Sequence, residues 1–216
     1  MLSAIKNLML QNLLLCSCPL GEELVDVAHE PCKENFGQLG AIIVQRSGAT
    51  PITLGDATLY ATWSVLLSAV TPVDKIQITP RLSNTTQEGG DARTTRGGAA
   101  SFGGTPIVIG SNPTTFMGEI LSTSQATIAS LKQLSCEKNL KCWLVNTKGQ
   151  IAGVSDDTHL LPFSIADDTL FFSDKTIGGY EDVDNNKMQF SFLEDWSDNF
   201  KVVALSDGNA LNLIEA

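Results

Sequence analysis

Short apolar segments separated by Gly, Pro, Asn and Asp constrain the fold of this chain more than any other feature. Between Lys187 and Leu193, Met188, Phe190 and Phe192 alternate with polar residues. This period of two is typical of a β-strand with one buried face. The segments that we predict to be strands are Gln38–Gln45, Ala57–Trp63, Lys75–Pro80, Pro106–Ile109, Thr114–Leu121, Lys141–Val145, Gln150–Val154, Leu160–Ile165, Thr169–Phe172, Lys187–Leu193 and Lys201–Leu205.

One segment has a clear helical pattern. Ser122–Cys136 places Ile128 and Leu131 on one face, and the Ser and Thr residues at its start can cap it. A second, short helix at Trp63–Val70 is the alternative to the strand at Ala57–Trp63, because apolar residues recur there on one side. Many short strands with one or two helices predict a mainly β fold, a β-sandwich or barrel with a flanking α-helix.

The chain divides into an N-terminal arm, residues 1–36, and a single β-rich domain, residues 37–216. No linker rich in Pro, Ser or charged residues interrupts the second part, and its length suits one large β domain. Residues 82–104 carry three Gly pairs with Ser, Thr and Asn between them. This composition predicts a long Gly-rich loop, and a loop of that length is commonly functional or ordered by a partner.

The arm begins with an apolar stretch, residues 1–15, that is too short to span a bilayer, which takes about 20 apolar residues. Its apolar residues at helical spacing are Leu2, Ile5, Leu8, Met9 and Leu13. We expect an amphipathic arm that packs on its own core or on a neighbouring subunit, with no membrane contact. A lipoprotein cleavage site needs a small residue before Cys16, and Leu15 is large, so export is the weaker interpretation.

The charge of the chain argues against nucleic-acid recognition. Its 216 residues include 24 acidic and 14 basic residues, for a formal net charge of −10. A phosphate-binding surface needs clustered Lys and Arg, and the sequence contains no basic run. We therefore expect no sequence-specific binding of nucleic acid.

No combination of residues in the sequence indicates catalysis. His29 and His159 both lie in polar, turn-like segments, and no Gly-x-Ser-x-Gly motif places a serine nucleophile. The acidic pairs are adjacent in sequence, so their side chains point apart rather than facing each other across a cleft. We therefore predict no catalytic residue and no enzyme activity.

Metal binding has only weak candidates. Cys16, Cys18 and Cys32, with His29 nearby, could ligate zinc, but zinc sites usually contain two pairs of closely spaced ligands. Five cysteines is an odd number, which favours free thiols in a reducing compartment. Residues 181–186 resemble the start of a calcium loop, yet the Gly and Glu that an EF-hand needs are missing. We predict no metal and no cofactor.

Seven short motifs lie in order along nearly the whole chain. They are Cys16-Ser17-Cys18-Pro19-Leu20, Asn35-Phe36-Gly37-Gln38, Val44-Gln45-Arg46, Pro113-Thr114-Thr115-Phe116, Ser173-Asp174-Lys175, Gly178-Gly179-Tyr180-Glu181 and Trp196-Ser197-Asp198-Asn199. Together they resemble virion structural proteins of tailed bacteriophages that infect Bacteroidetes-type hosts, of the tail-tube or neck-ring type. The resemblance implies a tail-tube-like β-sandwich or barrel that oligomerises into a ring, with a long loop or arm that reaches the adjacent ring.

The predicted function follows from both lines of argument. We expect a structural subunit of a phage virion that forms a ring or tube in the tail or neck and helps to form the DNA passage channel. Its partners would be itself and adjacent tail, portal or neck proteins, and it would be assembled into the virion in the host cytoplasm. A capsid-associated or decoration protein, or a surface-anchored binding module, is the alternative. The predicted assembly-interface residues are Leu8, Leu13, Arg93, Arg96 and Phe102.

Overall fold

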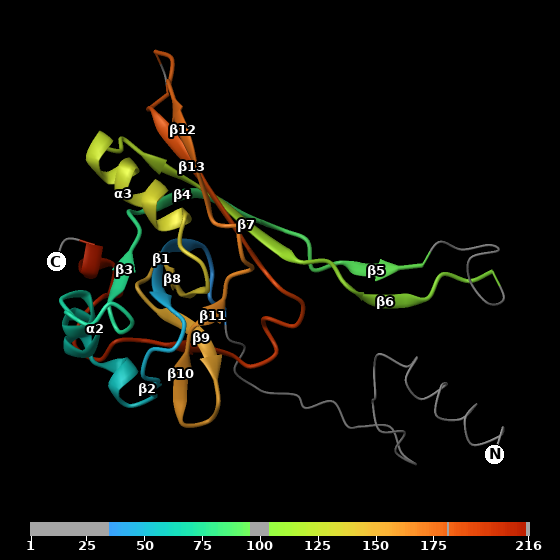
Figure 1. The fold of residues 1–216 in the computed structure, drawn as a ribbon, viewed down its shortest axis with the longest axis horizontal. Coiled ribbons are helices and arrows are strands. Elements are labelled where there is room, and N and C mark those ends of the chain that lie inside the picture. Colours follow the sequence, from blue (N-terminus) through green and yellow to red (C-terminus); the bar gives the residue numbers. More distant parts are fainter. Residues whose placement is uncertain (1–34, 96–103, 181, 215–216) are drawn as a thin grey trace. The chain divides into compact units, whose positions relative to one another are not determined.

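The computed structural model of the chain describes residues 35–95, 104–180 and 182–214 (Figure 1). The chain separates into two units. The larger contains Asn35–Ala92 and Gly110–Ala216, and the smaller includes Arg93–Ile109. The fold is mainly β, as predicted.

The larger unit is built on an eight-stranded antiparallel sheet, called the first sheet. Its strand order is β2-β10-β9-β8-β1-β3, with β11 also paired to β8 and β14 to β9. The strands are β1 (Leu39–Arg46), β2 (Ile52–Thr53), β3 (Ile76–Ile78), β8 (Leu140–Asn146), β9 (Ile151–Ser155), β10 (His159–Leu161), β11 (Phe163–Ser164) and β14 (Phe200–Val203).

Two neighbouring strands of the first sheet, β1 and β8, are buried on both faces. Ile42 in β1 and Leu144 in β8 contribute to one hydrophobic cluster. Ile43 and Val145, one residue further along each strand, contribute to a second cluster. Because successive side chains of a strand point to opposite faces, the short apolar runs in these strands supply two cores at once.

A second sheet of four strands has the order β12-β13-β7-β4. Its strands are β4 (Leu82–Glu88), β7 (Thr114–Leu121), β12 (Phe171–Thr176) and β13 (Asn185–Phe192). Strand β7 has the predicted bounds. The predicted alternation in β13 is confirmed, because Met188, Phe190 and Phe192 are buried whereas Lys187 and Gln189 are exposed.

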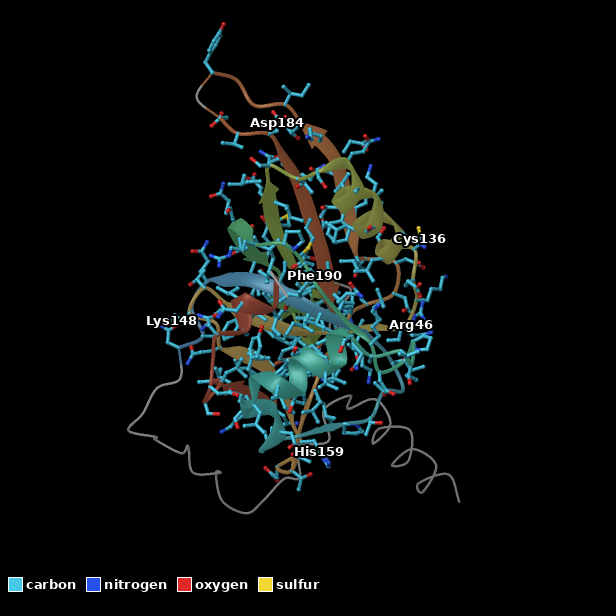
Figure 2. All side chains as sticks on the ribbon, turned by 90° about the vertical axis from the view of Figure 1, so that its left-hand side faces the viewer. Arg46, Cys136, Lys148, His159, Asp184 and Phe190 are labelled. Atoms are coloured by element: carbon cyan, nitrogen blue, oxygen red, sulfur yellow. The ribbon has the colours of Figure 1, made fainter. Side chains whose placement is uncertain are left out.

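Aromatic side chains fill the core that contains residues of both sheets. The rings of Phe116 and Phe190 stack with centroids 5.3 Å apart and an interplanar angle of 7°. Trp196 packs edge-on against Phe116 at 5.4 Å, and its indole N–H donates to Thr114 Oγ1 at 3.1 Å. Figure 2 shows Phe190 in the interior of the unit. Burial of such large rings is a major source of folding free energy.

Helix α3 (Gln125–Ser135) confirms the predicted helix and is shorter by a few residues at its start. Ser124 is its N-cap, and the Ser124 hydroxyl accepts a hydrogen bond from the Thr127 N–H at 3.1 Å. Leu131 is buried in the cluster that also contains residues of both sheets, and Ile128 and Leu134 pack against that cluster. The interior-facing residues of α3 therefore follow the predicted helical spacing.

The predicted strand at Ala57–Trp63 is wrong. The chain forms a 3₁₀ turn, η1 (Asp56–Thr58), followed by helix α2 (Tyr60–Leu67). The indole N–H of Trp63 donates to the Ala57 carbonyl at 3.0 Å, which closes this compact segment. Apolar residues at alternate positions resemble a strand in the sequence, but tertiary burial of Trp63 favours the helix. A second 3₁₀ helix, η2 (Ala210–Ile214), adds apolar side chains to the hydrophobic cluster that contains Trp63.

The predicted loop at residues 82–104 is wrong for most of its described length. Leu82–Glu88 is strand β4 and pairs with β7, and Ala92–Thr94 is strand β5, which pairs with β6 (Val108–Ser111). The segment is polar, so only its pairing with a neighbouring strand makes it a strand. Gly89 turns the chain with φ of +90°, where an added Cβ would lie 2.1 Å from the Pro113 carbonyl oxygen.

Candidate assembly interface

Most of the predicted site residues lie outside the part of the chain that the structure describes. These are Leu8, Leu13, Cys16, Cys18, Cys32, Arg96 and Phe102. Arg93 lies in β5 and is exposed to solvent. The predicted assembly interface and the weak zinc candidates therefore stay predictions.

The long open edges of the larger unit belong to its second sheet. Among the described residues, no strand pairs with the outer edge of β12 or of β4. These two strands have six and seven residues, whereas the end strands of the first sheet, β2 and β3, have two and three. Unpaired edge N–H and C=O groups are a template for another strand. The second sheet is therefore where edge pairing would be expected.

The edge strand β12 and the turn that follows it expose apolar side chains. Phe171 is 58% exposed, and Ile177 is 82% exposed. Tyr180 and Val183 in the same turn are also exposed. The Gly178 N–H donates to Asp184 Oδ1 at 3.0 Å across the base of this turn, and Figure 2 shows Asp184 near this end of the unit. This exposed apolar patch was not predicted from the sequence, although apolar residues beside a Gly pair in a turn are a usable signal.

The two-stranded sheet of β5 and β6, called the hairpin ribbon, also exposes apolar side chains. The Thr95 N–H donates to the Ile107 carbonyl at 2.8 Å, and the Ile107 N–H donates to Thr95 Oγ1 at 3.0 Å. Ile107, Val108 and Ile109 are 51%, 63% and 43% exposed. An isolated two-stranded ribbon is marginally stable in water, so a partner surface would stabilise it.

A groove of about 660 Å³ has lining residues from α3, β1 and β3. Arg46 and Glu137 lie at this groove and form a two-pronged ion pair, with Nη2 to Oε1 at 2.6 Å and Nε to Oε2 at 3.0 Å. The hydrogen bonds from Arg46 lower the pKa of Glu137 below its usual value. The pair joins the end of β1 to the residues just after α3.

A second groove of about 560 Å³, called the acidic groove, has an apolar floor and a charged rim. Leu161, Pro162 and Trp196 in its lining are half-buried, whereas Trp143 and Phe163, also in the lining, are buried. Leu193 at the rim is 59% exposed. Asp195 and Asp198, also in the lining, are exposed. The acidic groove therefore combines uncovered apolar surface with carboxylates.

Asp156 and His159 have a structural role in the turn between β9 and β10. Asp156 Oδ1 accepts hydrogen bonds from the backbone N–H of His159 at 2.6 Å and of Thr158 at 3.0 Å. These bonds hold the pKa of Asp156 well below its usual value. His159 Nδ1 lies 3.0 Å from Asp156 Oδ2, and Figure 2 shows His159 at the end of the unit away from Asp184. Thr158 Oγ1 lies 2.7 Å from His159 Nδ1 and donates to Asp156 Oδ1 at 2.9 Å, so these three side chains together close the turn.

The described cysteines differ in their surroundings. Cys136 and Cys142 are both free thiols, the first exposed and the second buried. Burial raises the pKa of the Cys142 thiol above its usual range. Within residues 35–95, 104–180 and 182–214, no group of three His, Cys, Asp or Glu side chains could hold a metal ion. In the same ranges, no helix is long and apolar enough to cross a bilayer.

Comparisons with known proteins give distant structural similarity and no match in sequence. No protein-family model and no curated protein matches the sequence. Among solved structures, the chain is similar to a chain in the tail of an empty GTA particle with C6 symmetry. The sequence identity is 14%, the match covers 60% of this chain and 87% of the other, and the TM-score is 0.34. At this TM-score the similarity assigns no function to this chain.

Proposed function

We propose that this chain is a structural subunit of a phage virion that oligomerises into a ring or tube in the tail or neck and helps to form the DNA passage channel. The observation that carries the proposal is the pair of open edges on one sheet, β12 at one side and β4 at the other. A sheet with two long open edges invites pairing with further copies.

The two open edges suit a head-to-tail contact. If β12 of one copy lies beside β4 of the next, the same contact repeats around the assembly, and a ring closes when the rotation returns to its start. Closure leaves no edge unpaired. The exposed ring of Phe171 on β12 would be buried at each contact, at about 25 cal/mol for each Å² of apolar surface removed from water.

The outer face of the second sheet has side chains that suit a passage for DNA. In the register of β7 and β13, Glu119 is opposite Lys187, and Met117 is opposite Gln189. This polar face contains no cluster of cations among the described residues of the two strands. Phosphates would find few partners there, so DNA could pass without being held.

Other parts of the chain would contact neighbours along the tail. The hairpin ribbon exposes apolar side chains that need a partner surface, and the N-terminal arm is predicted to be amphipathic. Both suit contacts with an adjacent ring or with tail, portal or neck proteins. In this proposal the protein is assembled in the cytoplasm of a Bacteroidetes-type host and is then part of the virion.

Electron microscopy of the purified full-length chain in negative stain tests the proposal. We expect rings or short tubes with a central opening. Phe171→Asp, which places a charge at the β12 edge, should reduce the fraction of rings. Val65→Asp is the matched control, because Val65 is also exposed, at 66%, but lies on α2 rather than on the second sheet. Single subunits at every concentration would contradict the proposal.

A further inference from the structure

We infer that the acidic groove of one copy receives the hairpin ribbon of a second copy. The inference rests on the proposed function, since it needs an assembly of this chain. It adds a specific contact that is separate from the pairing of β12 with β4. Two different surfaces of the same chain make this contact, so it is also head-to-tail and can repeat from copy to copy.

The charge of the hairpin ribbon distinguishes it from the rest of the chain. The segment that contains both strands of the ribbon, residues 92–111, includes Arg93 and Arg96 but no Asp or Glu, whereas the whole chain has a formal net charge of −10. A locally basic segment in an acidic protein is attracted to carboxylates on another copy. Arg is suited to such a contact because its guanidinium can bond a carboxylate with two N–H groups.

The apolar side chains of the ribbon also need cover. Ile107 and Ile109 are two residues apart in an extended segment, so they share one face, and Val108 points to the other. All three are exposed in the chain as described. A single partner surface can cover the face of the two isoleucines.

The acidic groove supplies a matching surface. Its volume of about 560 Å³ is lined in part by the half-buried apolar side chains of Leu161, Pro162 and Trp196. Leu193, at 59% exposure, extends this apolar surface to the rim. Aliphatic side chains from a ribbon would replace water over these groups, which favours association.

Carboxylates at the rim complete the match. Asp195 and Asp198 are held in one turn, in which the Asp198 N–H donates to the Asp195 carbonyl at 3.3 Å. Arg46 and Lys141 also line the groove, but Glu137 offsets the charge of Arg46 through their ion pair. The rim with the two aspartates is therefore the side that attracts a basic ribbon.

Cross-linking between mixed subunits tests the contact directly. Full-length subunits with Thr105→Cys, beside the ribbon, are mixed with subunits that have Ser164→Cys, in the groove lining, and treated with a short bis-maleimide. The control replaces Ser164→Cys by Lys148→Cys, because Figure 2 shows Lys148 on the opposite side of the larger unit from Arg46. Native cysteines are present in both mixtures, so the difference reports the new contact.

We expect at least a fivefold excess of linked dimer over the Lys148→Cys control in assembled protein. Asp195→Asn with Asp198→Asn should reduce that excess severalfold, whereas Asp157→Asn with Asp182→Asn should not. The two double variants are matched. Each removes two carboxylates, and each includes one residue with positive φ, Asp195 in the first and Asp157 in the second. Assembly without excess linkage, or linkage confined to single chains, would contradict this inference and leave the proposed function in place. No assembly at all would overturn the proposed function.

Discussion

The indole ring of Trp63 stands edge-on against that of Trp143, with ring centroids 5.0 Å apart and an interplanar angle of 89°. Trp63 comes from α2 and Trp143 from the central strand β8. Both are among the largest fully buried side chains, and the Trp143 N–H donates to the Leu160 carbonyl at 3.4 Å. This contact attaches the short helix to the first sheet.

Truncation of Trp63 should therefore destabilise the larger unit. Replacing a buried Trp with Ala removes its packing and leaves a cavity, which costs about 3–5 kcal/mol of unfolding free energy. Trp63→Phe should lower the unfolding free energy by less, because it keeps an aromatic ring in the core. It still leaves the Ala57 carbonyl without its hydrogen-bond donor. Urea denaturation followed by circular dichroism measures both. Val65→Ala, on the exposed side of α2, is the control, and an effect of Trp63→Ala as small as that of the control would contradict the packing described.

The turn held by Asp156 predicts a pH dependence. Hydrogen bonds from the His159 N–H and from Thr158 depress the pKa of Asp156 in the folded chain below its usual value of 3.8. Ionised Asp156 therefore stabilises the fold above the unfolded-state pKa, and this stabilisation is lost as pH falls through the folded-state pKa. Asp156→Asn should lower the melting temperature at pH 7, and the difference from wild type should shrink below about pH 4. A difference that is constant across this range would rule out the ionised carboxylate as its cause.

The two described thiols predict different reactivities. The thiolate is the reactive form, and burial both raises the pKa of Cys142 and blocks reagents. Cys136 is exposed at the end of α3 and should react with a maleimide in the folded chain. Peptide mass analysis should find Cys142 modified only after unfolding in denaturant. Equal modification of both in the native protein would contradict the buried position of Cys142.

Local sequence patterns predict the elements whose own periodicity matches their burial. Strand β13 and helix α3 are examples, because Met188 and Phe190 follow the period of a strand and Ile128 and Leu131 follow that of a helix. Helix α2 was predicted only as the alternative at Trp63–Val70, because its Trp, Tyr, Val and Thr residues favour strands and its N-cap residue, Leu59, makes no side-chain capping hydrogen bond.

The candidate interface depends on pairings between distant parts of the chain, which a local pattern does not contain. The polar strand β4 exists because it pairs with β7, for example Leu82 with Ile120. That pairing, together with the pairing of β12 with β13, leaves the two outer edges open. The composition of residues 82–104 indicates a functional segment, but only the strand order identifies the edges. The arm residues Leu8 and Leu13 lie outside the structural description, so their role stays a prediction.

The excess of acidic over basic residues predicts a weak interaction of the chain with DNA. The assembled protein should show no measurable retention of duplex DNA at about 150 mM salt, since log affinity falls by about 0.9 per phosphate contact for each log unit of salt. Fluorescence anisotropy with a labelled duplex measures this over a salt series. Arg81, Arg93 and Arg96 are the basic residues within or next to residues 82–104, and their replacement with Ala should change nothing in this assay. Retention with a steep salt slope would refute the prediction.

Hydrogen exchange at the two open edges tests the central claim most directly. Peptides that contain β4 and β12 are compared between dilute subunits and the assembled form, with the fully buried β1 and β8 as internal controls. The proposed edge pairing predicts that exchange slows at least tenfold in both β4 and β12 on assembly, while β1 and β8 exchange slowly in both states. Unchanged exchange at both edges in a protein that has assembled would contradict the account.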